Sequence, residues 1–219
     1  MKSSTLARRL CIRFRWRMGV WTLPVLALAL AGCLSRPPIH EQTFAFGALE
    51  ITAMNVPVGA RVLRIKSLQI DPQFDSRSLV YRTGEFSYTR DPYAEFLGSP
   101  ADILQAPISE RLRNDGCFSA VVSAGSAAKP DTLAEINVSQ LYGDIRQLGS
   151  PCAVLALQIT FLDATNGMAG KVIFQKNYTR TIPMKSATPA ALMEAWNRAL
   201  TEIFDEMASD FRAREKLGG

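Results

Sequence analysis

The sequence predicts an α+β domain, a two-layer sandwich in which two main helices pack on one face of a largely antiparallel sheet. Three observations predict this class. Several segments alternate apolar and polar residues with the period of a strand, most clearly Ala153–Leu162. A C-terminal segment instead repeats apolar residues at helical spacing. Finally, Thr83-Gly84 and Asn166-Gly167 supply tight turns between neighbouring strands.

Residues 1–32 predict a lipoprotein signal peptide. Basic residues precede a short apolar run, Val20–Ala31, which leads into Leu30-Ala31-Gly32-Cys33. Small residues before a cysteine suit lipidation of its thiol and cleavage ahead of it, so we expect Cys33 to be the lipid attachment site and to carry a diacylglycerol. A transmembrane anchor would need about 20 apolar residues. This run is shorter, and Pro24 interrupts it.

The net positive charge of the sequence comes from this leader. The whole sequence carries 25 basic and 20 acidic residues, but six of the basic ones and none of the acidic ones precede Cys33. The mature chain is therefore nearly neutral, with 19 basic and 20 acidic side chains. The net positive charge of the full sequence consequently gives no reason to expect a nucleic-acid partner.

Residues 33–43 predict a lipidated tether, and residues 44–219 a single domain. Ten tether residues reach about 30 Å when extended, so the domain should stay close to its membrane. Acylation of Cys33 by several chains would hold it firmly there. An aspartate after the cysteine retains such proteins in the inner membrane, whereas Leu34 and Ser35 follow it here. We expect the outer membrane, with the domain facing the periplasm.

The domain pattern is mostly strands. It opens with a short apolar segment at Phe44–Ile51. Alternation and turn residues then predict strands at Arg61–Ile70, Leu79–Arg82, Phe86–Thr89, Phe118–Val122, Leu133–Leu141, Ala153–Leu162 and Lys171–Ile182.

Two helices complete the domain. Ser99 is a typical N-cap before Pro100, and Gly116 a typical terminator, with Pro107 expected to kink the helix or leave a carbonyl unpaired. The second helix opens at Thr188-Pro189. It carries an apolar stripe that we interpret as core packing, made of Leu192, Trp196, Leu200, Ile203, Met207 and Phe211.

Two cysteines remain in the domain, Cys117 and Cys152. In the oxidising periplasm they could form a disulfide, which would close a loop of about 35 residues and contribute about 3 kcal/mol. The alternative is a pair of buried free thiols. The sequence leaves both open.

The residues that most enzymes need are missing. His40 is the only histidine and lies in the tether, which excludes a histidine-based triad or metal site in the domain. There is no Cys-x-x-Cys motif and no glycine-rich phosphate loop. Asp91 and Glu95 are interpreted as residues of a solvated loop. We expect a protein that binds or assembles, without catalytic activity, cofactor or metal.

Aromatic residues interleaved with charges follow the predicted hairpin. Tyr81, Arg82, Phe86, Tyr88, Tyr93 and Phe96 have the composition of a protein interface. Alternatively, one face of this segment fills the core. We treat all six residues as candidate partner contacts and keep both interpretations.

The same residues resemble a known family. Leu79-Val80-Tyr81-Arg82, Phe86-Ser87-Tyr88 and the segment Asp91–Phe96, followed by the helix Pro100–Gly116 and Phe118, are similar to ABC-type transport auxiliary lipoproteins, which include the paraquat-inducible type. The chain departs from the family at Phe96, where tryptophan is common, and in the short stretch Leu97-Gly98-Ser99.

The resemblance implies a partner system. Such lipoproteins accompany an ABC permease and ATPase with a mammalian-cell-entry (MCE) domain protein. These systems move lipids or other hydrophobic molecules between the two membranes, and the lipoprotein docks the assembly at the outer membrane, in some cases as a homo-oligomeric ring. The alternative is an outer-membrane biogenesis lipoprotein, an assembly factor or plug for a β-barrel. A serine hydrolase has no support beyond the presence of serine, lysine and aspartate.

Overall fold

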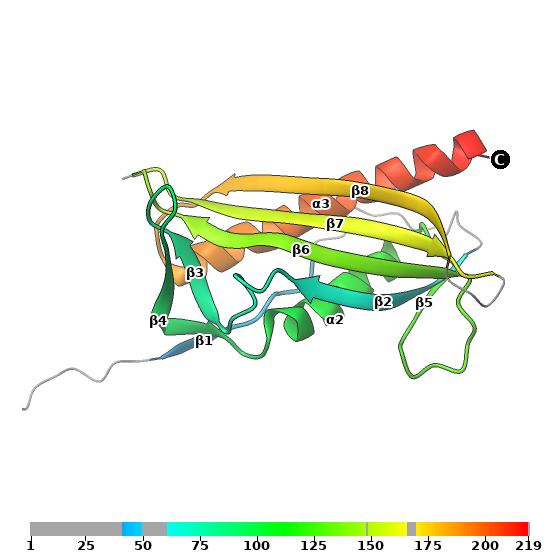
Figure 1. Cartoon of the computed structure of the whole chain (residues 1–219), viewed down its shortest axis with the longest axis horizontal. Coiled ribbons are helices and arrows are strands. Elements are labelled where there is room, and N and C mark those ends of the chain that lie inside the picture. Colours follow the sequence, from blue (N-terminus) through cyan, green and yellow to red (C-terminus); the bar gives the residue numbers. More distant parts are fainter. Residues whose placement is uncertain (1–40, 50–60, 148, 166–169, 219) are drawn as a thin grey trace, which may run out of the picture. The chain divides into compact units, whose positions relative to one another are not determined.

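The computed structural model describes residues 41–49, 61–147, 149–165 and 170–218 (Figure 1). The predicted leader, Cys33 and the Asn166-Gly167 turn lie outside these residues, as does the end of the Phe44–Ile51 segment. Within the described part, no helix combines the length and apolar character needed to span a membrane.

Eight strands and two helices form the described part of the chain. In order they are β1 (Gln42–Phe44), β2 (Val62–Ile70), β3 (Ser78–Arg82), β4 (Tyr88–Phe96), α2 (Pro100–Asn114), β5 (Ala120–Val122), β6 (Thr132–Asp144), β7 (Cys152–Asp163), β8 (Lys171–Pro183) and α3 (Pro189–Gly218). The strand segments and both helices that the sequence predicts are confirmed, most with shifted ends.

The sheet is built around three long antiparallel strands, β6, β7 and β8. The second edge of β6 is shared. Its first half pairs with β2 in parallel, and its last two residues, Gly143 and Asp144, pair with β3. The α+β prediction is confirmed. The sheet is mixed, however: its longest ladders are antiparallel, but four of the seven strand pairs in the described part are parallel.

Both helices cover the same face of the sheet (Figure 1). The alternate residues Leu155, Leu157, Ile159 and Phe161 of β7 are all buried beneath them. Phe161 meets Phe211 of α3 at a ring-centroid distance of 5.1 Å. All six residues of the predicted α3 stripe are buried, so the core interpretation is confirmed.

Helix α2 has the ends that its sequence predicts. The Ser99 hydroxyl accepts a hydrogen bond from the Asp102 N–H at 3.2 Å, and Gly116 follows the helix with a φ of 71°. Pro107 lies inside the helix on its buried side. Because the cap satisfies an otherwise unpaired donor, the first turn is stabilised despite the internal proline.

A buried charge cluster joins the two helices. The Arg111 guanidinium of α2 lies 2.6 Å from a carboxylate oxygen of Asp115 and 2.5 Å from one of Asp205 in α3. The side chains of Arg111 and Asp115 are both almost fully buried. Burial raises the pKa of the Asp115 carboxyl to about 6, although Arg111 and Arg212 favour its charged form.

Strand β4 extends beyond the prediction. It begins at Tyr88 and continues to Phe96, so the interpretation of Asp91 and Glu95 as residues of a solvated loop is wrong. A wide bulge explains the discrepancy, because the pairing with β3 jumps from Arg90 to Glu95. The Asp91 carboxylate accepts hydrogen bonds from the N–H groups of Tyr93 and Ala94 at 2.9 and 3.0 Å. Pro92 is tolerated because it lies within the bulge, outside the registered positions of both neighbouring strands, where its missing N–H is not needed.

The two cysteines are free in the structure. Cys152 opens β7, whereas Phe118, next to Cys117, packs against Phe161, nine residues farther along that strand. At about 3.3 Å per residue this places the thiols roughly 30 Å apart, far beyond the reach of a disulfide. Of the two possibilities that the sequence leaves open, the structure therefore has free thiols, with Cys117 buried and Cys152 only partly buried.

Gly143 is the position where β3 crosses closest to β6. A Cβ atom there would lie 2.9 Å from the Tyr81 ring and 3.2 Å from the Leu192 side chain. We expect Gly143→Ala to lower the free energy of unfolding by about 1–3 kcal/mol, since the ring must shift within a packed core. Urea denaturation measures this effect.

The matched control is Gly125→Ala, because no atom lies within 4 Å of a Cβ at that site. It should change stability by less than about 0.5 kcal/mol. Equal effects of the two substitutions would contradict the close-approach explanation.

Candidate docking surface at the edge of the sheet

The long edge strand β8 is protected against pairing with another chain. It pairs only with β7. Lys176 and Arg180 of β8 form ion pairs with the acidic residues Glu202, Glu206 and Asp210 of α3. Charged side chains on an edge strand oppose edge-to-edge association. We therefore looked for a docking surface on β3 and β4, which lie on the other side of β6.

Four of the five large hydrophobic residues that are exposed in the described part lie on β4 or near its ends. The exposed fractions are 87% for Phe86, 43% for Tyr88, 50% for Tyr93 and 66% for Leu97, all on β4 or directly beside it. The remaining large exposed hydrophobic residue of the described part is Val172 on β8, at 47%. This concentration on one strand indicates an interaction surface.

The structure divides the six predicted contact residues. Tyr81 and Phe96 are buried: the ring of Phe96 stacks on Phe46 and Trp196, and that of Tyr81 lies against Gly143. For these two the contact prediction is wrong and the core alternative is correct. Neighbouring side chains of a strand point to opposite faces of the sheet. On β3, Tyr81 therefore points into the core, whereas Arg82 does not.

The buried Tyr81 hydroxyl has no hydrogen-bond partner among the described residues. Removing it should cost nothing, so we expect Tyr81→Phe to leave the free energy of unfolding unchanged or to raise it by up to about 1 kcal/mol.

Tyr178→Phe is the contrasting variant. The Tyr178 hydroxyl donates to the Asp210 carboxylate at 3.0 Å, and its loss should cost about 1.5–3 kcal/mol. Thermal denaturation of both variants measures the difference. A destabilised Tyr81→Phe variant would mean that its hydroxyl has a partner.

Arg82, Phe86 and Tyr88 form what we call the aromatic hairpin. The turn between β3 and β4 is closed by the Thr83 N–H, which donates to the Ser87 carbonyl at 2.9 Å. The Arg82 guanidinium donates to the carbonyls of Gly84 and Glu85 and lies 5.8 Å from the centre of the Tyr88 ring. These contacts hold the turn, so Phe86 is presented on an ordered loop.

Beneath the hairpin lies an aromatic cluster that the sequence analysis missed. The Tyr88 ring lies 5.9 Å from that of Phe74 and 5.5 Å from that of Tyr142, between ring centroids. Tyr142 pairs with Val154, whose neighbour Leu155 faces the helices, so the cluster lies on the opposite, uncovered sheet face. Phe74 and Tyr142 are themselves buried, so they join the hairpin to the hydrophobic core from the face that the helices leave uncovered.

A hollow of about 510 Å³ adjoins this cluster on the uncovered face. It is lined by Tyr142, Asp144, Arg146 and Cys152, among others. Hydrogen bonds from Arg146 lower the pKa of Asp144, and burial raises the pKa of the Cys152 thiol. Cys152 is therefore protonated at neutral pH and lacks the character of an activated nucleophile.

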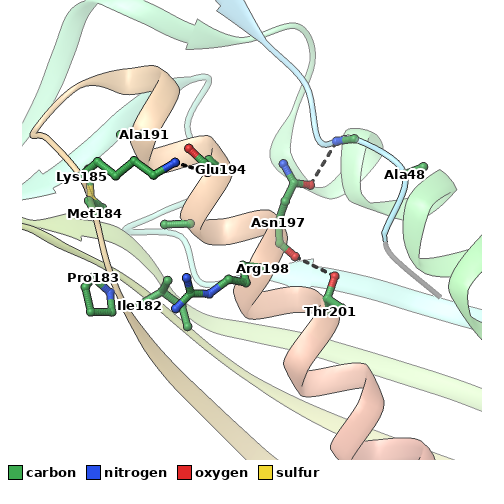
Figure 2. Close-up of a pocket in the computed structure, with 12 residues that line it drawn as sticks. Ala48, Ile182, Pro183, Met184, Lys185, Ala191, Glu194, Asn197, Arg198 and Thr201 are labelled. Atoms are coloured by element: carbon green, nitrogen blue, oxygen red, sulfur yellow. Dashed lines mark hydrogen bonds and ion pairs between the residues drawn. The ribbon is translucent and has the colours of Figure 1, made fainter. Parts of the chain in front are cut away.

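A second hollow, of about 460 Å³, lies between residues 47–48, α3 and the end of β8 (Figure 2). Lys185 and Glu194 pair with each other at 2.9 Å on its rim. The side-chain amide oxygen Oδ1 of Asn197 accepts a hydrogen bond from the Gly47 N–H at 3.1 Å. Its polar groups are thus engaged in structural contacts. Over the described ranges of the chain, no three His, Cys, Asp or Glu residues gather into a metal-binding group.

The family model of the ABC-type transport auxiliary lipoprotein component matches residues 48–208, most of the chain. The chain belongs to this family. The resemblance noted in the sequence is thereby confirmed. The protein is an auxiliary lipoprotein component of ABC-type transport, and its exposed aromatic hairpin lies within the matched region. No curated protein matches the chain.

Solved structures share the fold of this auxiliary lipoprotein. Protein XCC0632 from Xanthomonas campestris, of family DUF330, superposes with a TM-score of 0.67 at 18% identity, over 80% of this chain and 97% of its own. The structure of an uncharacterized protein superposes with a TM-score of 0.60 at 10% identity, over 78% and 98%. These similarities concern the fold alone.

Proposed function

We propose that this auxiliary lipoprotein is the lipid-anchored docking component of an MCE-type ABC transport system. Cys33 carries the lipid anchor, and the domain faces the periplasm from the outer membrane. The aromatic hairpin binds the MCE-domain protein, which with its permease and ATPase moves lipids or hydrophobic molecules between the membranes. The protein acts by position and assembly and catalyses no reaction.

The observation that carries the proposal is the exposure of Phe86 on an ordered turn. An aromatic side chain that is 87% exposed gains much of its burial energy only when a partner covers it. Holding the turn in advance lowers the entropy cost of binding. Aromatic and arginine side chains are also those that contribute most at protein interfaces, as with Arg82 beside Tyr88.

The proposal includes assembly of several copies as a ring around the MCE protein. The charged pairs along β8 oppose assembly through that edge. The ring contacts would therefore use other surfaces and leave each aromatic hairpin available to the partner.

Site-specific photo-crosslinking in cells tests the proposal. A photoreactive phenylalanine analogue replaces Phe86 in the full chain, and the matched control carries it at Val172, an exposed residue on the protected edge. We expect an adduct with an MCE-domain protein from position 86 and none from position 172.

The adducts also distinguish the alternatives. An adduct between position 86 and an outer-membrane β-barrel would support an outer-membrane biogenesis lipoprotein instead. The absence of any adduct from position 86, with the protein present at its normal level, would overturn the docking role of the hairpin.

A further inference from the structure

We infer that a second apolar patch, formed by Tyr93 and Leu97, rests on the surface of the lipid bilayer. This inference rests on the proposed lipid anchor at Cys33. It concerns a part of β4 separate from the aromatic hairpin. It also reassigns Tyr93 from the predicted partner contacts to the membrane. We call Tyr93 and Leu97 the entry patch.

The entry patch flanks the point where the chain enters the domain. β1 runs parallel to the end of β4, with Gln42 opposite Ala94 and Phe44 opposite Phe96. Tyr93 therefore lies one position before this paired stretch. Leu97 lies one position after it and donates its N–H to the Phe44 carbonyl at 2.8 Å. The two exposed side chains bracket the first strand of the domain.

The length of the tether limits how far this patch can lie from the membrane. Cys33 precedes Gln42 by nine residues, which span at most about 30 Å. The entry patch is therefore the exposed apolar surface beside β1, the strand through which the tether enters the domain. Val172 pairs with Leu162, which lies ten residues along β7 from Cys152. Because β3 joins the sheet near Cys152, Val172 lies at the opposite end of the sheet.

The chemistry of the patch suits an interface between lipid and water. Leucine contributes apolar area, and tyrosine combines an aromatic ring with a hydroxyl that can stay in the headgroup region. The nearby cation Arg77 is paired with Glu95 at 2.5 Å, so the patch does not require anionic lipids. Because the anchor already confines the domain to the surface, even a weak apolar contact would be occupied.

Fluorescence quenching in vesicles tests this contact. The lipidated protein, produced from the full chain, is reconstituted into phosphatidylcholine vesicles containing brominated phosphatidylcholine. Tryptophan is introduced as Tyr93→Trp or Leu97→Trp, with Val172→Trp as the matched exposed control. Trp196, the only other tryptophan after Cys33, is fully buried and provides the common background. We expect quenching at positions 93 and 97 to be at least about twofold stronger than at position 172.

Flotation of the same samples separates the two proposals. Equal quenching at all three positions, or none, in protein that floats with the vesicles would overturn the bilayer contact alone and assign the patch to a protein partner. Protein that fails to float, and that behaves like a Cys33→Ala variant, would overturn the lipid anchor and this inference with it.

Discussion

Replacing Arg111 with methionine is expected to lower the free energy of unfolding by about 3–5 kcal/mol. Methionine keeps much of the volume but leaves the carboxylate of Asp115 buried without its closest cation, and removes the ion pair to Asp205. This is a large part of the total stability of a single domain. Chemical denaturation at neutral pH, followed by circular dichroism, measures it.

Two comparisons make this prediction specific to the buried charge. Arg198→Met removes an exposed pair with Glu202 and should cost less than about 1 kcal/mol. Loss of Arg111 should also raise the pKa of Asp115 further above its present value of about 6. Acidification from pH 7 to pH 5 would then protonate Asp115 in the folded variant before the unfolded chain and recover part of the loss. A cost that is independent of pH would contradict the explanation.

Replacing Phe86 with alanine is expected to weaken binding of the purified protein to its MCE-domain partner at least about thirtyfold, equivalent to about 2 kcal/mol. Among the described residues this side chain is the most exposed large hydrophobic one, and it is not part of the buried core. Its loss should therefore leave folding unchanged. Surface plasmon resonance with immobilised partner measures the affinity.

Val172→Ala is the control, because it truncates an exposed apolar side chain on the protected edge. It should leave the affinity unchanged. If Phe86→Ala and the control bound the partner equally well, the aromatic hairpin could not be the docking surface.

Local patterns predicted the elements well because each depends on residues close in sequence. The caps of α2, the stripe of α3 and the alternation in β7 follow from side-chain periods of about 3.6 and 2 residues. β4 was predicted too short for a local reason as well. Pro92 normally argues against a strand. Here it lies in a bulge, which is stabilised by the hydrogen bonds that the Asp91 carboxylate accepts from the Tyr93 and Ala94 N–H groups.

What could not be predicted depends on contacts between distant segments. The pairing of Arg111 with Asp205 joins residues far apart in the chain. Phe74 and Tyr142 meet Tyr88 only because β2 and β3 share one edge of β6. Composition indicated the segment that carries the exposed aromatic side chains. It could not show that Tyr81 and Phe96 face inward whereas Phe86 faces outward, since that depends on where each strand begins.

Because β2 and β3 share one edge of β6, the part of the sheet that contains β3 is expected to open more easily than the rest. Among the described residues, β3, β4 and β1 are joined to the rest of the sheet through two registered positions, Tyr81 opposite Gly143 and Arg82 opposite Asp144. A unit held by so short a ladder opens at a lower free energy than the long strands beside it. Amide protons of β4 should thus exchange with deuterium faster than those of β7. Binding of the aromatic hairpin by a partner would slow that exchange, so deuterium uptake at β4 would report when the partner is bound.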